Sequence, residues 1–169
     1  MTEFPVTVVD AGPMVRATLL LPGCPPERAL AAFTDPAMLR QWWGGELTFT
    51  PAEGGPYIVH FAKLGQTMRG GVVGYEPASR LEFTWGWDHE PGAAGRTVLV
   101  TVAEAGHSAA SAGLQRPEHP GRPAGTELTV LHGPHGEGAA EQAARSDHRE
   151  GWEYFLARLG QLLAPAPSE

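Results

Sequence analysis

Histidine is the residue type of this sequence best suited to chemistry near neutral pH. His132 and His135 are separated by a Gly-Pro pair and His148 follows downstream, so a metal site could be drawn from the three side chains. The Gly-Pro pair predicts a turn, whereas paired histidine ligands usually project from one helix face, and neither cysteine nor carboxylate stands at a suggestive spacing. We therefore expect no metal, and we expect His148 to help begin the last helix or to bond a neighbouring backbone group.

Acid–base chemistry by isolated polar side chains is the second possibility. His60 and His132 could each act as a general base, but interior histidines with satisfied ring nitrogens are the commoner outcome. Arg69, if its strand turned it inward, would need an anionic ligand group or an internal partner. The sequence has no phosphate-binding glycine loop, nucleophile elbow or paired carboxylates. No catalytic residue is assigned, and whether the chain is an enzyme stays open.

Aromatic side chains indicate a binding function. Indole offers a large apolar wall with one N–H for orientation. Over residues 80–87, alternation places Leu81, Phe83, Trp85 and Trp87 on one strand face, which we expect to look inward. A structural role in the core is the alternative for each of the tryptophans, including Trp85 on this strand. The expected pocket residues are Trp42, Trp43, Tyr57, His60, Arg69, Phe83, Trp85, Trp87, His132, Trp152 and Phe155.

A series of strands and three helices must position these side chains. Alternation predicts a first strand over 15–21, and Pro25-Pro26 and Asp35-Pro36 suit the starts of two short helices after it. Short turn-like separators between several of the later strands indicate antiparallel hairpins. These strands are expected over about 46–50, 55–62, 66–75, 80–87, 96–103 and 126–132.

One long amphipathic helix is expected to close the chain. From about Gly138 to Leu163, large apolar residues recur at steps of three and four, beginning with Trp152. This stripe must be buried, and the long helix is the element available to cover the apolar face of the sheet. Residues 106–125, rich in Gly, Ala, Ser and Pro, are interpreted as a mobile loop, and residues 164–169 as a disordered tail.

Length and composition favour a single domain over residues 1–169, with a core of about 14–163. The net charge of -7 and the scattered basic residues argue against nucleic-acid binding, and no apolar run approaches the roughly 20 residues of a membrane span. The N-terminus does not read as a secretory signal and the lone Cys24 can form no internal disulfide, so we expect a cytoplasmic protein. The bias toward Arg, Ala, Gly and Pro indicates a GC-rich, bacterial genome.

Several local motifs, taken in order, resemble the SRPBCC superfamily, whose fold is also called START-like or helix-grip. Within it the chain is most similar to the branch of activators of heat shock protein 90 ATPase and their homologues. The resemblance implies an α+β fold: a curved antiparallel sheet of about six or seven strands around the C-terminal helix, with two short helices after the first strand. The matching motifs are Phe33-Thr34-Asp35-Pro36, Leu39-x-x-Trp42-Trp43-Gly44, Gly54-Gly55-x-Tyr57, Gly71-x-Val73, Glu76-Pro77-x-x-Arg80-Leu81-x-Phe83-Thr84-Trp85, Thr126-x-Leu128-Thr129-Val130-x-His132 and His148-x-x-Gly151-Trp152.

The expected function is binding of a small hydrophobic or amphipathic molecule between the sheet and the C-terminal helix, without a cofactor. Superfamily members similar to polyketide cyclases and aromatases do chemistry in the same cavity, and here that chemistry would fall to Tyr57, His60, Arg69 and His132. The name of the branch suggests, as a third hypothesis, a protein that assists a chaperone. The ligand's identity and a homodimeric state stay open.

Overall fold

The protein folds into one antiparallel sheet and three helices, as its computed structural model shows for the described residues 6–88, 95–105 and 125–164. The sheet order is β1-β2-β8-β7-β6-β5-β4-β3. The strands are β1 (Val6–Ala11), β2 (Met14–Leu21), β3 (Glu46–Phe49), β4 (Pro56–Phe61), β5 (Gln66–Glu76), β6 (Arg80–Trp85), β7 (Arg96–Glu104) and β8 (Thr126–Gly133). The helices are α1 (Pro26–Ala31), α2 (Pro36–Trp42) and α3 (Ala139–Leu163).

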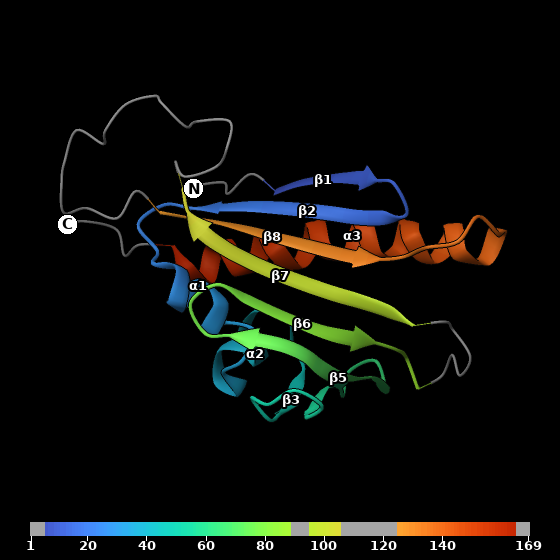
Figure 1. Cartoon of the computed structure of the whole chain (residues 1–169), viewed down its shortest axis with the longest axis horizontal. Helices are drawn as coiled ribbons and strands as arrows, with labels where there is room; N and C mark the ends of the chain where they lie inside the picture. The colour runs from blue at the N-terminus through green and yellow to red at the C-terminus, as the bar shows by residue number, and fades with distance from the viewer. Residues whose placement is uncertain (1–5, 89–94, 106–124, 165–169) are drawn as a thin grey trace.

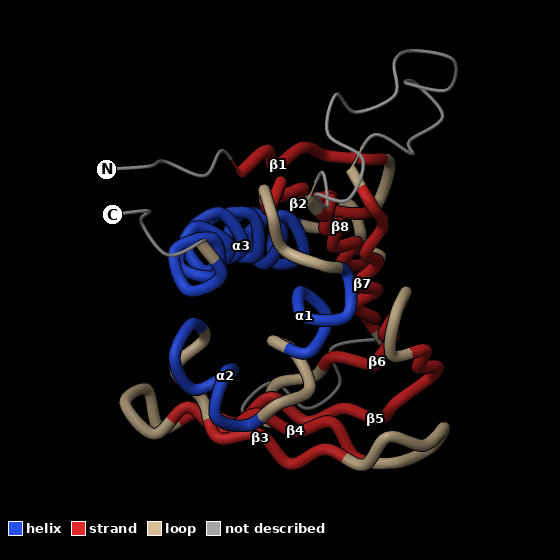
Figure 2. Tube along the Cα trace, turned by 90° about the vertical axis from the view of Figure 1, so that its left-hand side faces the viewer, coloured by secondary structure: helices blue, strands red, loops and turns tan. Residues whose placement is uncertain are grey.

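The sheet curves around α3. Figure 1 shows α3 lying along the part of the sheet formed by β1, β2 and β8. Figure 2 shows the sheet bending through β7 and β6, so that β5, β4 and β3 lie across from the helix, with α1 and α2 at one end. The helix-grip fold expected from the sequence is confirmed.

The described sheet contains eight strands, where six or seven were expected. The additional strand is β1, which pairs with β2 along its whole length. In β1, Val6 and Val8 are half-buried while Thr7 and Val9 are exposed, the pattern of an edge strand with one covered face. The two short helices consequently follow the second strand of the chain.

The other elements lie near their expected ranges, and α3 runs from its N-cap Gly138 to Leu163, as the periodicity predicts. The expected loop (106–125) and tail (164–169) fall almost entirely outside the described residues. Of the described helices, none combines the length and the apolar character needed to cross a membrane.

Alternation along the strands places the core on the concave face. Two aromatic side chains tie the short helices to this core: Tyr57 Oη donates to the Phe33 carbonyl oxygen at 2.6 Å, and Trp42 Nε1 donates to the Ala32 carbonyl oxygen at 2.8 Å. Trp87 is half-buried beyond the end of β6. The other residues expected to face inward on β6, Leu81, Phe83 and Trp85, are buried. On β8, the alternating residues Leu128, Val130 and His132 are buried as well.

A glycine pair, Gly70 and Gly71, forms a corner within β5. In β5, residues 66–71 pair with β4, and the paired register with β6 begins at Val72, with a shift between Val72 and Gly74. At the corner, a Cβ atom added to Gly70 would overlap the carbonyl oxygen of Thr84 on β6. Only glycine allows the two backbones to approach this closely.

We predict that Gly70→Ala destabilises the fold and that Gly71→Ala serves as its matched control. The added Cβ at Gly70 meets backbone, whereas at Gly71 it would lie 3.6 Å from its nearest neighbour, the Gly55 carbonyl oxygen. We expect Gly70→Ala to lower the free energy of unfolding by about 2 kcal/mol or more, and Gly71→Ala to change it by less than about 1 kcal/mol. Urea denaturation followed by tryptophan fluorescence measures both values, and equal losses would contradict the role given to this corner.

Candidate functional site

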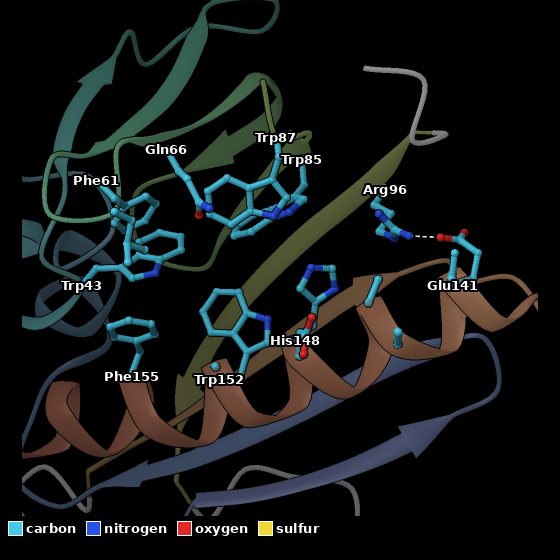
Figure 3. A pocket seen from close by; sticks show the side chains of 16 residues that line it. Trp43, Phe61, Gln66, Trp85, Trp87, Arg96, Glu141, His148, Trp152 and Phe155 are labelled. Atoms are coloured by element: carbon cyan, nitrogen blue, oxygen red, sulfur yellow. Dashed lines mark hydrogen bonds and ion pairs between the residues drawn. The ribbon is translucent and has the colours of Figure 1, made fainter. Parts of the chain in front are cut away.

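A cavity of about 730 Å³ lies between α3 and the part of the sheet that curves away from it (Figure 3). Its volume falls within the range of about 300–1,000 Å³ typical of small-molecule sites. Across from α3 it is lined by Trp43, at the end of α2, and by Phe61, Leu64, Gln66, Trp85, Trp87 and Arg96, which lie in or next to the strands. On the helix side it is lined by Ala140, Glu141, Ala143, Ala144, Asp147, His148, Gly151, Trp152 and Phe155.

The cavity exists because the two halves of α3 present different side chains to the sheet. In the C-terminal half, Leu156, Leu159 and Leu163 are buried in the hydrophobic core. In the N-terminal half, many of the lining positions carry residues too short to reach across to the strands. These small lining residues are Ala140, Ala143, Ala144 and Gly151.

Aromatic rings form the wall at one end of the cavity. The ring centroid of Trp43 lies 5.5 Å from that of Trp152, 6.0 Å from that of Trp85 and 5.9 Å from that of Phe61. Trp85 and Trp87 meet edge to face at 5.4 Å. This end therefore presents flat apolar surfaces suited to a planar hydrophobic molecule.

Charged side chains gather at the other end, around Arg96 (Figure 3). Arg96 opens β7 and is only 3% exposed, and its Nη2 donates to the carboxylate of Glu141 in the first turn of α3. Glu141 also accepts from the backbone N–H of Gly136 at 3.2 Å. Asp147 adds a second carboxylate to the lining. The cavity thus joins an aromatic end to a polar end.

A chain of hydrogen bonds fixes the tautomers of two histidines beside the cavity. Nδ1 of His135 lies 3.2 Å from the Pro13 carbonyl oxygen, which can only accept, so His135 carries its proton on Nδ1. Its Nε2 lies 2.9 Å from Nδ1 of His148, which must therefore donate. The remaining nitrogen of His148, Nε2, is left as a hydrogen-bond acceptor on a residue that lines the cavity.

Burial keeps these imidazoles neutral. It lowers the pKa of His148 to about 3, with smaller contributions from His135 and Arg96. It also lowers the pKa of His132 well below its ordinary value and, to a smaller extent, that of His135, against the opposing effect of the Pro13 carbonyl. Among the described residues, no group of three or more His, Cys, Asp or Glu side chains is arranged to hold a metal ion.

The cavity brings together part of the set expected from the sequence: Trp43, Trp85, Trp87, Trp152 and Phe155. Trp42, Tyr57 and Phe83 lie in the core instead, where the Tyr57 and Phe83 rings stack at 3.9 Å. Burial raises the pKa of Tyr57 well above its ordinary value, which keeps the phenol protonated as a donor to Phe33.

The polar members of the expected set do not meet in the cavity. His60 was interpreted as an interior residue, but its side chain is exposed because Tyr57, Val59 and Phe61 take the inward face of β4. Arg69 also points outward and pairs with Asp88 at 3.0 Å. Both placements correct the expectation that His60 and Arg69 line the pocket.

His132 is buried behind the cavity wall. Its ring centroid lies 4.7 Å from that of Trp85 and 4.1 Å from that of His148. His148 was expected near the start of α3, but it lies well inside the helix and bonds His135.

The sequence contained signals for two features that its interpretation missed. Arg96 is in phase with Val98, Val100 and Val102, so period-two alternation already places it on the inward face of β7. The small lining residues of α3 recur at helical steps from Ala140 onward, a stripe that leaves room beside a helix.

Comparisons with known proteins agree with this architecture. A family model described as "Activator of Hsp90 ATPase homolog 1-like protein" matches residues 23–164. No curated protein gives a significant sequence match. Among solved structures, a Mesorhizobium loti protein is 24% identical over 89% of this chain and 96% of its own, with a TM-score of 0.68.

Two further structures are similar to the chain. The protein DynU16, from the dynemicin biosynthetic locus, is 26% identical over 90% of this chain and 48% of its own, with a TM-score of 0.67. An HSP90 activator from Plasmodium falciparum is 18% identical over 89% of this chain and 95% of its own, with a TM-score of 0.62. The likenesses to the Mesorhizobium and Plasmodium proteins show the fold alone.

We predict that acid destabilises the protein through His148. The pKa of this residue is about 3 in the fold and about 6.5 in an unfolded chain, so between these values the unfolded state binds more protons. The free energy of unfolding should therefore fall as the pH drops below about 6.5, with a slope approaching about 1.4 kcal/mol per pH unit for this histidine.

Replacement of the histidine isolates its contribution. His148→Gln should make the free energy of unfolding, measured by urea denaturation between pH 7.5 and 4.5, depend less steeply on pH. The pH dependence that remains would come from His132 and His135. His60→Gln, which alters an exposed histidine, should retain the wild-type profile. A His148→Gln profile parallel to that of the wild type would show that burial of His148 does not govern the acid response.

Proposed function

The chain belongs to the family of activator of Hsp90 ATPase homolog 1-like proteins, and we propose that it binds a small hydrophobic or amphipathic molecule in the cavity beneath α3. The observation that carries this proposal is a cavity of about 730 Å³ whose walls include every tryptophan of the chain except Trp42. Aromatic walls bury a large apolar area of a ligand without losing much side-chain entropy.

The cavity supports binding better than the alternatives. The residues considered for cyclase-like chemistry, Tyr57, His60, Arg69 and His132, are distributed over the core and the outer face of the sheet. An interaction with a chaperone has the likeness to the Plasmodium activator in its favour, but at 18% identity that likeness concerns the fold. The cavity, in contrast, is a property of this chain's own side chains.

We predict that Gly151→Leu blocks binding while the protein stays folded. Gly151 lines the cavity, and a Cβ atom built on it meets nothing within 4 Å outside its own helix. Leucine should extend into the open space, and it also favours a helix interior over glycine by up to about 1 kcal/mol. The affinity for the neutral dye N-phenyl-1-naphthylamine, measured by its fluorescence, should fall about tenfold or more, while the free energy of unfolding is maintained or rises.

The matched control adds the same side chain to the same helix outside the cavity. Ser146 is exposed and does not line the cavity, so Ser146→Leu should retain the wild-type affinity for the dye. The proposal fails if the wild-type protein does not bind the dye, or if Gly151→Leu and Ser146→Leu bind it equally well.

A further inference from the structure

We propose that the cavity selects a planar aromatic ligand that carries a neutral carbonyl oxygen, and that Trp85 and Arg96 donate hydrogen bonds to this oxygen. The inference rests on the proposed function, because it names the class of ligand that the same cavity takes. It comes from polar atoms inside the protein that lack partners.

Among the described residues, most of the unpartnered buried nitrogens belong to side chains that line the cavity or contact its wall. In the described part of the chain, the buried side-chain nitrogens without a hydrogen-bond partner are Arg80 Nε, Trp85 Nε1, Arg96 Nε and His132 Nε2. Arg80 does not line the cavity, whereas Trp85 and Arg96 do, at 7% and 3% exposure. Buried donors are nearly always satisfied in folded proteins, and these two nitrogens belong to residues that line a ligand-sized cavity, so we assign their missing partner to the ligand.

The sheet brings these donors together. Trp85 on β6 and Arg96 on β7 are paired residues in the antiparallel register, so their side chains leave the same face of the sheet side by side. His132 lies directly behind them, with its ring 4.7 Å from that of Trp85. Because its Nδ1 accepts from Trp152, its Nε2 carries the proton and is a third donor in the same region.

The shape of the cavity orients the rest of the ligand. Figure 3 shows Trp43, Phe61 and Phe155 at the end of the cavity opposite Arg96, with Trp85 and Trp152 between them on facing sides. The Trp85 and Trp152 rings lie 6.3 Å apart and are tilted by 52°, so together they form one aromatic surface. A flat ring system lying against this surface would direct one edge toward Arg96. The aromatic end thus takes the apolar body, and the donors take an oxygen on its rim.

The charges at this end favour a neutral oxygen over a carboxylate. Glu141 already neutralises Arg96, and Asp147 adds a further negative charge to the described lining. A carboxylate on the ligand would lie near Glu141 and be repelled, whereas a carbonyl oxygen can accept from Trp85 Nε1 and Arg96 Nε without displacing that ion pair.

A matched pair of ligands tests the inference. Fluorene and 9-fluorenone share a tricyclic skeleton, and the ketone adds one oxygen. Their dissociation constants are measured by displacement of N-phenyl-1-naphthylamine from the full-length protein. We expect the ketone to bind about tenfold more tightly than the hydrocarbon, as for a hydrogen bond to a charged donor, although the hydrocarbon is the more hydrophobic of the two.

Variants identify the donors. Trp85→Phe keeps an aromatic ring but loses the N–H, and Arg96→Met loses the guanidinium; each should reduce the preference for the ketone to about threefold or less. The ratio of the two dissociation constants is the readout, because both residues also line the cavity. Arg80→Met removes a comparable unpartnered nitrogen away from the cavity and should leave the preference intact. Circular dichroism checks that each variant is folded. If Arg96→Met does not fold, the result for Trp85→Phe alone tests whether a buried donor sets the preference for the ketone.

The outcomes separate this inference from the proposed function. Equal binding of fluorene and 9-fluorenone, both weakened by Gly151→Leu, would overturn the carbonyl preference and leave the cavity as a binding site. Tighter binding of fluorene-9-carboxylate than of 9-fluorenone would overturn the neutral oxygen in favour of an anion. Failure of all three compounds and of the dye to bind would instead overturn the proposed function.

Discussion

A buried hydrogen bond between helix and sheet organises the interior of this protein. Trp152 Nε1 donates to His132 Nδ1 at 3.0 Å, joining the middle of α3 to β8, and both side chains are almost wholly shielded from solvent. Because an indole nitrogen can only donate, this bond places the proton of His132 on Nε2. Along α3, the leucines of the core lie C-terminal to this tryptophan, and most of the residues that line the cavity lie N-terminal to it.

The cavity results from the different side chains in the two halves of α3 and from the curvature of the sheet. Leucines in the C-terminal half of the helix hold it against the core, and this anchoring lets the N-terminal half carry small residues that would not stabilise a helix by packing. The sheet bends through β7 and β6 so that β5, β4 and β3 lie across from the helix (Figure 2), and the glycine corner at Gly70 lets β5 approach β6 closely. The cavity is therefore built into the fold, and its chemistry is set by the side chains that surround it.

Local periodicity predicted the fold well, because alternation and helical spacing depend only on neighbouring residues. The resemblance to activators of heat shock protein 90 ATPase is confirmed, and Trp85, Trp152 and Phe155 face the cavity as their phases imply. The other placements depend on how distant parts of the chain meet, which local periodicity does not show. Trp42 and Trp43 lie at the end of α2, and only the path of the chain through Gly44 (φ 79°) determines which ring reaches the cavity. Arg69 precedes the glycine corner and points outward, so the arginine inside the cavity is Arg96, whose partner Glu141 is distant in sequence.

The indole N–H signals of the tryptophans in a ¹H–¹⁵N spectrum test the central claim, that a ligand enters between α3 and the sheet. Trp42 lies in the core with its N–H bonded to Ala32, while the other indoles line the cavity. Titration with 9-fluorenone should shift the N–H signals of Trp43, Trp85, Trp87 and Trp152, most strongly that of Trp85, and leave Trp42 unchanged. A spectrum that does not change, or one in which Trp42 moves as much as the others, would contradict the account.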